Sequence, residues 1–506
     1  MALLGPNRYP GGRVNPLILG LVIYSVVILG VGIWAARRNR TQEDYLLADR
    51  SLNPWVAAFS ERASGESAWL LIGLPGLAFA TGLSTIWVGI GCCAGIAFSW
   101  FAVARRLREE TERVRAITLA DFLSARFDDR RHILRIVATA IILFFFTFYV
   151  AAQFLAAGKV LNFYLDIPPL AGMGIGALLV LFYTAAGGLL AVSWTDLVQG
   201  VIMLLTLALL PLAVLGELGG PAGLHAKLAE LGGTYLDAAP GNSGWLAFSG
   251  VIGSLGIGLG YMGQPHLVLR FMAIESSEAV KVGRRVAVGW ALIAFFGAIL
   301  IGMTGLAHFG PEAMGAGRLI ADQEQLMPLM ARTFMPEWIA VIMIVGAIAA
   351  MMSTADSQLL ASASAISEDI YRRLVNPAAT EGKLVALGRL ATLGIGVVGF
   401  ILAWRADDFV YGMVLYAWAG LGSAFGPPLL LALHWRRTSW AGALAGFVTG
   451  TVTVVIWYNV PALKGLLYEM IPGFFLSLAA TFLFSMWFPH RPGPRTDAIA
   501  KDAAKS

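Results

Sequence analysis

The stretch Phe59-Ser-Glu-Arg-Ala-Ser-Gly-Glu-Ser-Ala-Trp-Leu-Leu-Ile-Gly-Leu-Pro-Gly76 is an apolar segment that charges, glycines and a proline interrupt repeatedly. It lies within a run from about residue 55 to residue 80, which is long enough to span a bilayer. Glu61, Arg62 and Glu66 are unexpected there, because each charge near the centre of a bilayer costs about 2.5–3.5 kcal/mol on insertion scales. Such residues normally face a cavity or a partner.

Two interpretations of this stretch are open. It could be a kinked packing helix with Glu61 and Arg62 near the membrane interface. Alternatively, Gly65 lets the helix open among serines and frees backbone carbonyls, which at membrane depth must be buried in protein or line a wet site. We favour this second interpretation, a discontinuous helix whose break helps to form a binding site.

The composition predicts an all-α polytopic membrane protein. Hydrophobic residues make up 58% of the 506 residues and charged residues 13%, with a mean hydropathy of +0.73. We expect no nucleic-acid partner, since no basic block is interleaved with aromatics. Cys92 and Cys93 are adjacent in an apolar run and are expected to be buried thiols, not a disulfide or a metal site. Residues 1–15 lack the pattern of a signal peptide, so the first apolar run is expected to be retained.

Apolar runs of bilayer length predict about thirteen spans. They lie near residues 15–36, 54–80, 83–104, 133–161, 168–188, 191–217, 245–270, 286–309, 338–370, 383–404, 408–435, 438–459 and 465–488. With the N-terminus outside, the inner side receives 27 lysines and arginines, Arg270 among them, and the outer side 8, leaving out Arg62. This asymmetry predicts an outer N-terminus and a cytoplasmic C-terminus. We also expect a short interfacial helix over 118–129 and an outer lid over 219–244.

A second interruption lies in Gly253-Ser-Leu-Gly-Ile-Gly-Leu-Gly-Tyr-Met-Gly-Gln-Pro-His266. No strand precedes these glycines and no lysine follows them, which argues against a phosphate-binding loop. Close helix packing is the alternative explanation for the glycines. Pro265 favours a break, because it removes a backbone donor. The two interrupted spans are five spans apart, as expected if spans 2–6 and 7–11 are inverted repeats with the site between the breaks.

The ninth span carries a polar cluster in an otherwise apolar segment. Ser353, Thr354, Asp356 and Ser357 supply the oxygen ligands that a dehydrated hard cation needs. A buried carboxylate such as Asp356 is hard to explain structurally. Asp196 follows Ser193 at the expected start of the sixth span, where capping of a helix by Ser193 is the structural alternative.

On these residues the chain resembles the sodium:solute symporter family, and within it the bacterial sodium/proline symporters, over nearly its whole length. The stretches that carry the resemblance are 69–76, 190–196, 260–266, 352–354, 358–360 and 416–420. The resemblance implies a LeuT-like core of two five-helix inverted repeats with discontinuous spans 2 and 7. We therefore expect one transporter domain over 1–506, composed of an extra helix at 15–36, repeats at 54–217 and 245–435, two helices within 438–488 and a cytoplasmic tail at 489–506.

The resemblance also implies which residues bind ions and substrate. The main sodium site would use the carbonyls of Ala63, Glu66 and Ala350 with the hydroxyls of Ser353 and Thr354. A second cation, present in some members, would use positions matching Asp196, Ser353, Asp356 and Ser357. The substrate pocket would comprise Ser67, Trp69, Tyr149, Tyr261 and Pro265, with Gln264 beside it.

Two positions depart from the proline symporters. This chain has Gly65 where they have an important aspartate, and the following Glu66 is no simple replacement, since one helical step turns a side chain by roughly 100°. Where they have a pocket tryptophan, this chain has Ile257, and this replacement enlarges and flattens that wall of the substrate pocket.

The sequence therefore predicts a transporter in the inner cell membrane, not an enzyme, that uses sodium as the coupling ion, has no cofactor and imports proline or a similar amino acid by alternating access. A symporter of another small solute, such as a sugar or carboxylate, and coupling to protons through Glu66 or Asp356 are alternatives. A transporter-like sensor or channel is less favoured, because we see no appended signalling domain. The sequence does not indicate the oligomeric state.

Overall fold

The structure is a computed structural model that describes residues 16–36, 41–232, 234–239, 244–315, 317–406 and 410–489. The expected outer segment 1–15, the arginines at 37, 38 and 40, part of the expected lid and the tail beyond residue 489 lie outside the described residues.

In this part of the chain the regular elements are helices, apart from two isolated bridges. Here η denotes a short 3-10 or π segment. The first half contains α1 (Pro16–Ala36), α2 (Gln42–Leu47), η1 (Ala48–Arg50), α3 (Pro54–Ala68), η2 (Trp69–Gly73), α4 (Leu74–Thr81), η3 (Gly82–Thr85), α5 (Ile86–Phe98), η4 (Ser99–Ala104), α6 (Arg105–Arg113), α7 (Leu119–Arg126), α8 (Ile133–Leu165), α9 (Pro169–Glu217) and α10 (Gly220–Glu230).

The second half begins with α11. It contains α11 (Trp245–Gly256), η5 (Ile257–Met262), α12 (Pro265–Ala273), α13 (Val280–Phe309), η6 (Pro311–Ala313), η7 (Gln323–Gln325), α14 (Leu326–Phe334), α15 (Glu337–Ser364), η8 (Ala365–Val375), α16 (Glu381–Arg405), α17 (Val410–His434), α18 (Trp440–Asn459), α19 (Pro461–Lys464) and α20 (Met470–Trp487).

Eleven stretches of the described chain are long and apolar enough to cross a membrane. One of them, Pro54–Arg113, has 60 residues and includes the expected spans 54–80 and 83–104, with Gly82 at a φ of 67° between them. A straight helix of that length would measure about 90 Å, three times the hydrocarbon thickness, so this stretch must turn back. A shorter apolar helix, Pro169–Phe182, lies in the expected span 168–188. The all-helical membrane architecture is confirmed, whereas the count of thirteen spans stays a prediction.

The expected sixth span near 191–217 agrees with the apolar stretch Gly188–Glu217, but the alternative that Ser193 caps its start is wrong. The backbone turns at Gly188, which has a φ of 64°, and Ser193 lies inside α9. Ser193 is buried and its hydroxyl caps no helix in the described chain. Glycine is the residue that adopts this conformation without strain, so the turn occurs a few residues before the polar motif.

Two segments outside the long helices were also expected. Helix α7 matches the predicted interfacial helix, and the Thr118 hydroxyl caps it by accepting the Asp121 backbone N–H at 2.9 Å. The predicted lid region contains helix α10, and its later part contacts η3 and the first turn of α5. The Leu83 N–H donates to the Tyr235 carbonyl at 2.8 Å, and Trp87 Nε1 donates to the Ala238 carbonyl at the same distance.

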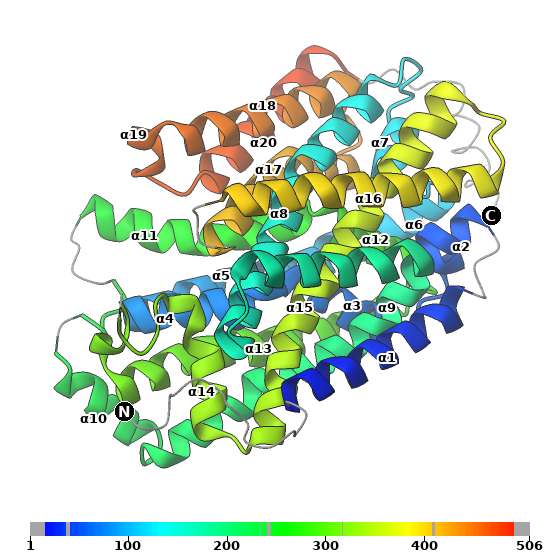
Figure 1. Cartoon of the computed structure of the whole chain (residues 1–506). Coiled ribbons are helices and arrows are strands. Elements are labelled where there is room, and N and C mark those ends of the chain that lie inside the picture. Colours follow the sequence, from blue (N-terminus) through cyan, green and yellow to red (C-terminus); the bar gives the residue numbers. More distant parts are fainter. Residues whose placement is uncertain are drawn as a thin grey trace.

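Figure 1 shows how the helices surround α15. Helix α1 packs along α9 and α15 at one side of the bundle, and α18 and α20 pack against each other and α17 at the opposite side. All residues of α15 from Met343 to Ser364 are buried. The polar cluster of this helix is therefore enclosed by α3, α8 and α9, which all contact α15.

Candidate functional site

The first broken helix opens at Ser67, not at Gly65 as expected. Ser67 has φ 43° and ψ −163°, while Gly65 is helical. Gly65 has a packing role instead, because a Cβ there would lie 3.2 Å from Leu267 Cδ1 in α12. A non-glycine residue at such a backbone conformation is strained and needs support from its surroundings, which is typical of a functional site.

The second broken helix opens between α11 and α12, as predicted. Segment η5 winds tightly from Ile257 to Met262, and Gln264 is extended before Pro265 starts α12. The packing explanation of the glycines also holds, since a Cβ at Gly258 would lie 2.0 Å from the Gly91 carbonyl oxygen. Trp418 Nε1 donates to the Ile257 carbonyl at 2.9 Å and so satisfies a carbonyl in the irregular segment.

Oxygen atoms of α3 and α15 converge beside the first break. Ser353 Oγ lies 3.0 Å from the carbonyl oxygen of Ala63 and 3.0 Å from that of Ala350. Thr354 Oγ1 lies 3.0 Å from the Ser64 carbonyl oxygen. Hydroxyls can rotate to turn a lone pair toward a cation, and sodium sites in broken-helix transporters are built from such carbonyls. The donor set therefore fits a hard cation. Of the expected ligands, Ala63, Ala350, Ser353 and Thr354 are brought together. The fifth expected ligand, the Glu66 carbonyl, accepts the Trp69 backbone N–H across the break.

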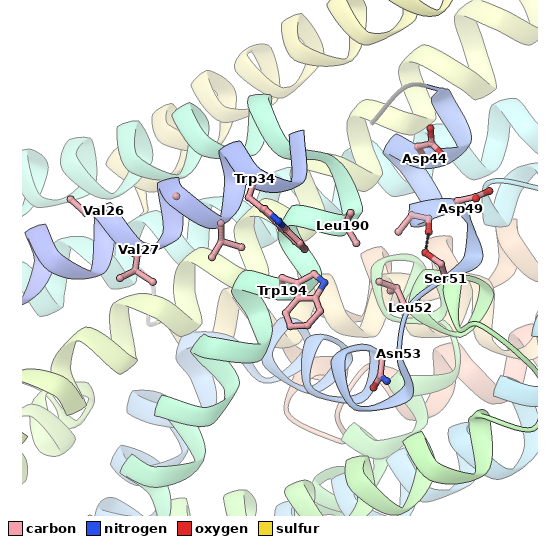
Figure 2. Close-up of a pocket in the computed structure, with 13 residues that line it drawn as sticks. Val26, Val27, Trp34, Asp44, Asp49, Ser51, Leu52, Asn53, Leu190 and Trp194 are labelled. Atoms are coloured by element: carbon pink, nitrogen blue, oxygen red, sulfur yellow. Dashed lines mark hydrogen bonds between the residues drawn. The ribbon is translucent and has the colours of Figure 1, made fainter. Parts of the chain in front are cut away.

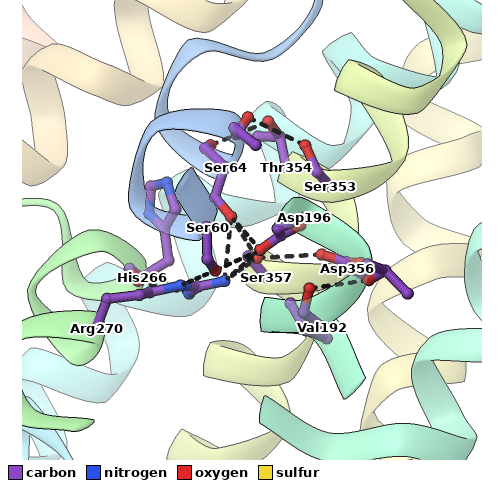
Figure 3. Close-up of polar contacts among 12 residues, drawn as sticks. Ser60, Ser64, Val192, Asp196, His266, Arg270, Ser353, Thr354, Asp356 and Ser357 are labelled. Atoms are coloured by element: carbon purple, nitrogen blue, oxygen red, sulfur yellow. Dashed lines mark hydrogen bonds and ion pairs between the residues drawn. The ribbon is translucent and has the colours of Figure 1, made fainter. Parts of the chain in front are cut away.

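A second polar cluster surrounds the guanidinium of Arg270 (Figure 3). Asp196 Oδ2 accepts from Ser60 Oγ at 2.6 Å, from Ser64 Oγ at 3.1 Å and from Arg270 Nη2 at 3.2 Å. Arg270 Nη2 also donates to Ser357 Oγ at 2.5 Å, and Ser357 Oγ lies 3.1 Å from Asp356 Oδ1. Three of the four expected residues of a second cation site, Asp196, Asp356 and Ser357, are thus close together with an arginine among them, whereas Ser353 belongs to the first cluster.

The assignment of Arg270 to an inner loop was wrong, because its side chain is fully buried. Arg270 Nη1 donates to the His266 carbonyl at 2.7 Å, and Nε donates to Ser60 Oγ at 3.1 Å. The sequence did contain a signal. An arginine that stands between apolar neighbours on both sides, as in Leu267-Val-Leu-Arg-Phe-Met-Ala273, is unexpected in a solvated loop.

The charges of the first broken helix pair with one another. Arg62 Nε donates to Glu61 Oε2 at 2.6 Å, Arg62 Nη2 donates to Glu61 Oε1, and Arg62 Nη1 donates to Glu66 Oε1 at 2.6 Å. Trp100 Nε1 also donates to Glu61 Oε2, at 3.0 Å. All four side chains are buried in the protein, so Glu61 and Arg62 are shielded from solvent, and their depth in the membrane stays a prediction.

The expected substrate residues come from both broken helices and from α8. Trp69 packs against Phe295 and Tyr411, with ring centroids 5.7 and 6.0 Å apart. The Tyr261 ring meets the edge of Trp418 at 4.7 Å, and the Tyr149 ring meets His266 at 6.2 Å. These rings enclose the region of the breaks with flat apolar surfaces.

Several buried polar atoms near the breaks have no hydrogen-bond partner among the described residues. They are the Tyr149 hydroxyl, Gln264 Oε1 and both ring nitrogens of His266. Leaving a buried polar group without a partner costs about 1–3 kcal/mol, so such groups often mark a place where water or a ligand binds. The sequence did not single out His266 as a site residue, although it belongs to the motif that ends the second break.

A cavity of about 860 Å³ lies between α1, η1 and α9 (Figure 2). Val26, Val27 and Trp34 line it from α1, and Trp194 lies opposite, its ring edge-to-face with that of Trp34 at 6.0 Å. Its 13 lining residues include none of the expected substrate or cation residues. It is therefore separate from the region of the two breaks.

Comparison with known proteins agrees with this geometry. The profile of the sodium:solute symporter family matches residues 45–450. The high-affinity proline transporter PutP of Bacillus subtilis (strain 168) is 40% identical over 460 residues, which cover 91% of this chain and 95% of that protein. The sodium/proline symporter of Escherichia coli (strain K12) is 37% identical over 473 residues, 93% of each chain.

Solved structures show the same fold. A sodium-coupled sialic acid symporter in a substrate-bound, outward-open state has a TM-score of 0.81 at 20% identity, covering 95% of this chain and 99% of that one. The nucleobase-cation-symport-1 transporter Mhp1 in a closed conformation has a TM-score of 0.54 at 14% identity, covering 92% and 99%. These neighbours agree with the predicted LeuT-like fold with its two discontinuous spans.

Proposed function

Because the chain belongs to the sodium:solute symporter family, it is a multi-pass, sodium-coupled transporter and not an enzyme, and we propose that it imports proline or a closely related amino acid by alternating access. The observation that carries the proposal is the oxygen cluster of Ala63, Ala350 and Ser353 beside the break at Ser67. An ion there would contact both the broken helix α3 and the enclosed helix α15. Sodium binding would therefore fix the geometry of the break before substrate enters.

The substrate would lie between the two breaks. Ser67, Trp69, Tyr149, Ile257, Tyr261, Gln264 and Pro265 are the residues that we assign to this pocket. Aromatic walls suit a small ring or an aliphatic side chain, whereas the unpartnered Tyr149 hydroxyl and Gln264 oxygen suit the polar head of a zwitterion. The proline transporters among the relatives support proline as the first substrate to test.

Two further assignments belong to this proposal. The lysine and arginine bias supports an outer N-terminus and a cytoplasmic C-terminus. Asp196, Ser353, Asp356 and Ser357 could hold a second cation only if Arg270 gave up part of its contact with Asp196 and Ser357, because its Nη2 lies 3.2 and 2.5 Å from their oxygens.

The decisive experiment is uptake of labelled proline into vesicles that contain the purified protein, under an imposed sodium or proton gradient. We expect uptake with an inward sodium gradient and inhibition by unlabelled proline. Competition with other amino acids, sugars and carboxylates then ranks the substrates. Transport that a proton gradient drives with sodium absent would show that the assignment of sodium is wrong.

A further inference from the structure

We propose that Glu61, Arg62 and Glu66 form a buried relay that positions Tyr261, so that the substrate meets the ring of this tyrosine and not its hydroxyl. The inference rests on the proposed pocket and deepens it, because it assigns different tasks to the two pocket tyrosines. It concerns side chains of the first broken helix that the proposed sodium and substrate sites do not use.

The relay is continuous from η4 to η5. Trp100 Nε1 donates to Glu61, Glu61 accepts two hydrogen bonds from Arg62, and Arg62 Nη1 donates to Glu66 Oε1. The Tyr261 hydroxyl then lies 3.0 Å from Glu66 Oε2 and 3.2 Å from Glu66 Oε1. The Arg62 guanidinium also lies 5.0 Å from the centroid of the Tyr261 ring, within the range of a cation–π contact.

Charge makes each link of the relay hard to break. Two carboxylates and one guanidinium are buried together, and removing one partner of such a group leaves a buried charge without compensation. Glu66 Oε1 has the guanidinium as well as the tyrosine, but Oε2 has only the Tyr261 hydroxyl as a donor among the described residues. If Tyr261 turned its hydroxyl to a substrate, Glu66 Oε2 would lose that donor.

The hydroxyl of the second pocket tyrosine, Tyr149, differs from that of Tyr261 in its hydrogen bonding. The Tyr149 hydroxyl is buried and makes no hydrogen bond of normal geometry among the described residues, and its polar neighbour is the hydroxyl of Ser67, another residue of the proposed pocket. Tyr149 is therefore free to donate to a substrate, whereas Tyr261 is not. The polar head of the substrate should then contact Tyr149, and its apolar part should lie on the ring of Tyr261, four residues after Ile257 in η5.

Gly65 leaves space beside the Arg62 guanidinium of this relay. A Cβ at position 65 would lie 3.8 Å from Arg62 Nη2. An aspartate at this position would bring a competing carboxylate to the guanidinium that holds Glu66. Gly65 therefore leaves Arg62 to its contacts with Glu61 and Glu66.

A double-mutant cycle tests the relay. Substrate binding to the purified full chain is measured for Glu66→Gln, Tyr261→Phe and the double variant, with proline and its six-membered-ring homologue as probes. We expect each single change to weaken binding about tenfold, since each removes a hydrogen bond to a charged group. In the Tyr261→Phe background, Glu66→Gln should add less than twofold, because the link is already absent.

Controls separate the relay from the pocket itself. Tyr468→Phe is the control, since this half-buried tyrosine also donates its hydroxyl, to the Leu415 carbonyl at 3.0 Å, but lies outside the relay and the proposed pocket, and it should leave both probes unchanged. Tyr149→Phe tests the pocket. If Tyr149→Phe weakens binding but the effects of Glu66→Gln and Tyr261→Phe multiply to about a hundredfold, the relay is wrong and the pocket stands. If none of these variants changes binding while sodium-driven transport persists, the proposed pocket fails as well.

Discussion

Asp196 of α9 and Arg270 of α12 form an ion pair inside the protein, with 3.2 Å between Oδ2 and Nη2 and both side chains fully buried. The pair connects the second broken helix to α9, and Ser60 and Ser64 of the first broken helix contact both partners. The two breaks, α9 and α15 therefore share one hydrogen-bonded cluster. A change in either broken helix must rearrange this cluster.

We predict that Arg270→Gln destabilises the protein by about 3–5 kcal/mol, because it leaves Asp196 as an uncompensated buried charge. The double variant Asp196→Asn/Arg270→Gln should be more stable than Arg270→Gln alone. Thermal unfolding of the purified variants measures both effects. Equal melting temperatures for the single and double variants would contradict a direct ion pair.

Asp196 and Asp356 should make sodium-driven uptake sensitive to low pH. A proton on Asp196 or Asp356 removes negative charge near the cation region, so protons and sodium should compete there. We predict that uptake falls as the pH of the medium is lowered, and that Asp196→Asn or Asp356→Asn impairs it. Initial rates at several sodium concentrations show whether more sodium restores uptake, as competition requires.

Ser353 should contribute directly to sodium affinity. Ser353→Ala removes the hydroxyl that lies 3.0 Å from two carbonyl oxygens, and we expect the sodium concentration for half-maximal uptake to rise about tenfold, or ~1.4 kcal/mol. Thr354→Ala should act in the same direction. Ser364→Ala is a matched control, because this serine lies on the same helix and donates only to the Ala361 carbonyl. Unchanged sodium dependence in both Ser353→Ala and Thr354→Ala would contradict the assignment.

The aromatic residues of the pocket should contribute more to substrate affinity than to sodium affinity. We predict that Tyr149→Ala or Tyr261→Ala weakens substrate binding more than sodium binding measured without substrate, because the rings supply the walls of the pocket. Isothermal titration with each ligand separately provides the two affinities. An equal fall in both affinities would mean that these tyrosines support the fold instead.

How much of this site could be predicted from the sequence depends on how far apart in the chain the interacting residues lie. The interrupted helices and the oxygen cluster on α15 are local patterns, so residues such as Pro265 and Ser353 indicated them. The sequence predicts the opening at Gly65, whereas the helix opens at Ser67. Glycine is needed at 65 because Leu267 packs against it, and that contact joins residues roughly 200 positions apart, so no local pattern reveals it. The pairing of Arg270 with Asp196 is likewise a long-range contact that hydropathy alone does not reveal.

Gly65→Asp tests how this chain differs from the proline symporters. The Cβ would meet Leu267 Cδ1 at 3.2 Å and Cδ2 at 3.4 Å, so Leu267 must shift, and such overpacking costs about 1–3 kcal/mol of stability. The new carboxylate would lie near Arg62 Nη2 and draw the guanidinium from Glu66. It would also add negative charge next to Ser64 and Glu66, close to the expected sodium ligands.

We therefore predict that Gly65→Asp increases sodium affinity without making the transporter selective for proline, because Ile257 still leaves that wall of the pocket open. Gly65→Asn is the matched control, since it adds nearly the same volume without the charge. Sodium dependence of uptake, and competition between proline and larger amino acids, measure the two effects. If Gly65→Asn raises sodium affinity as much as Gly65→Asp, the change follows from helix packing. If Gly65→Asp alone restores preference for proline, the wall at Ile257 does not set selectivity.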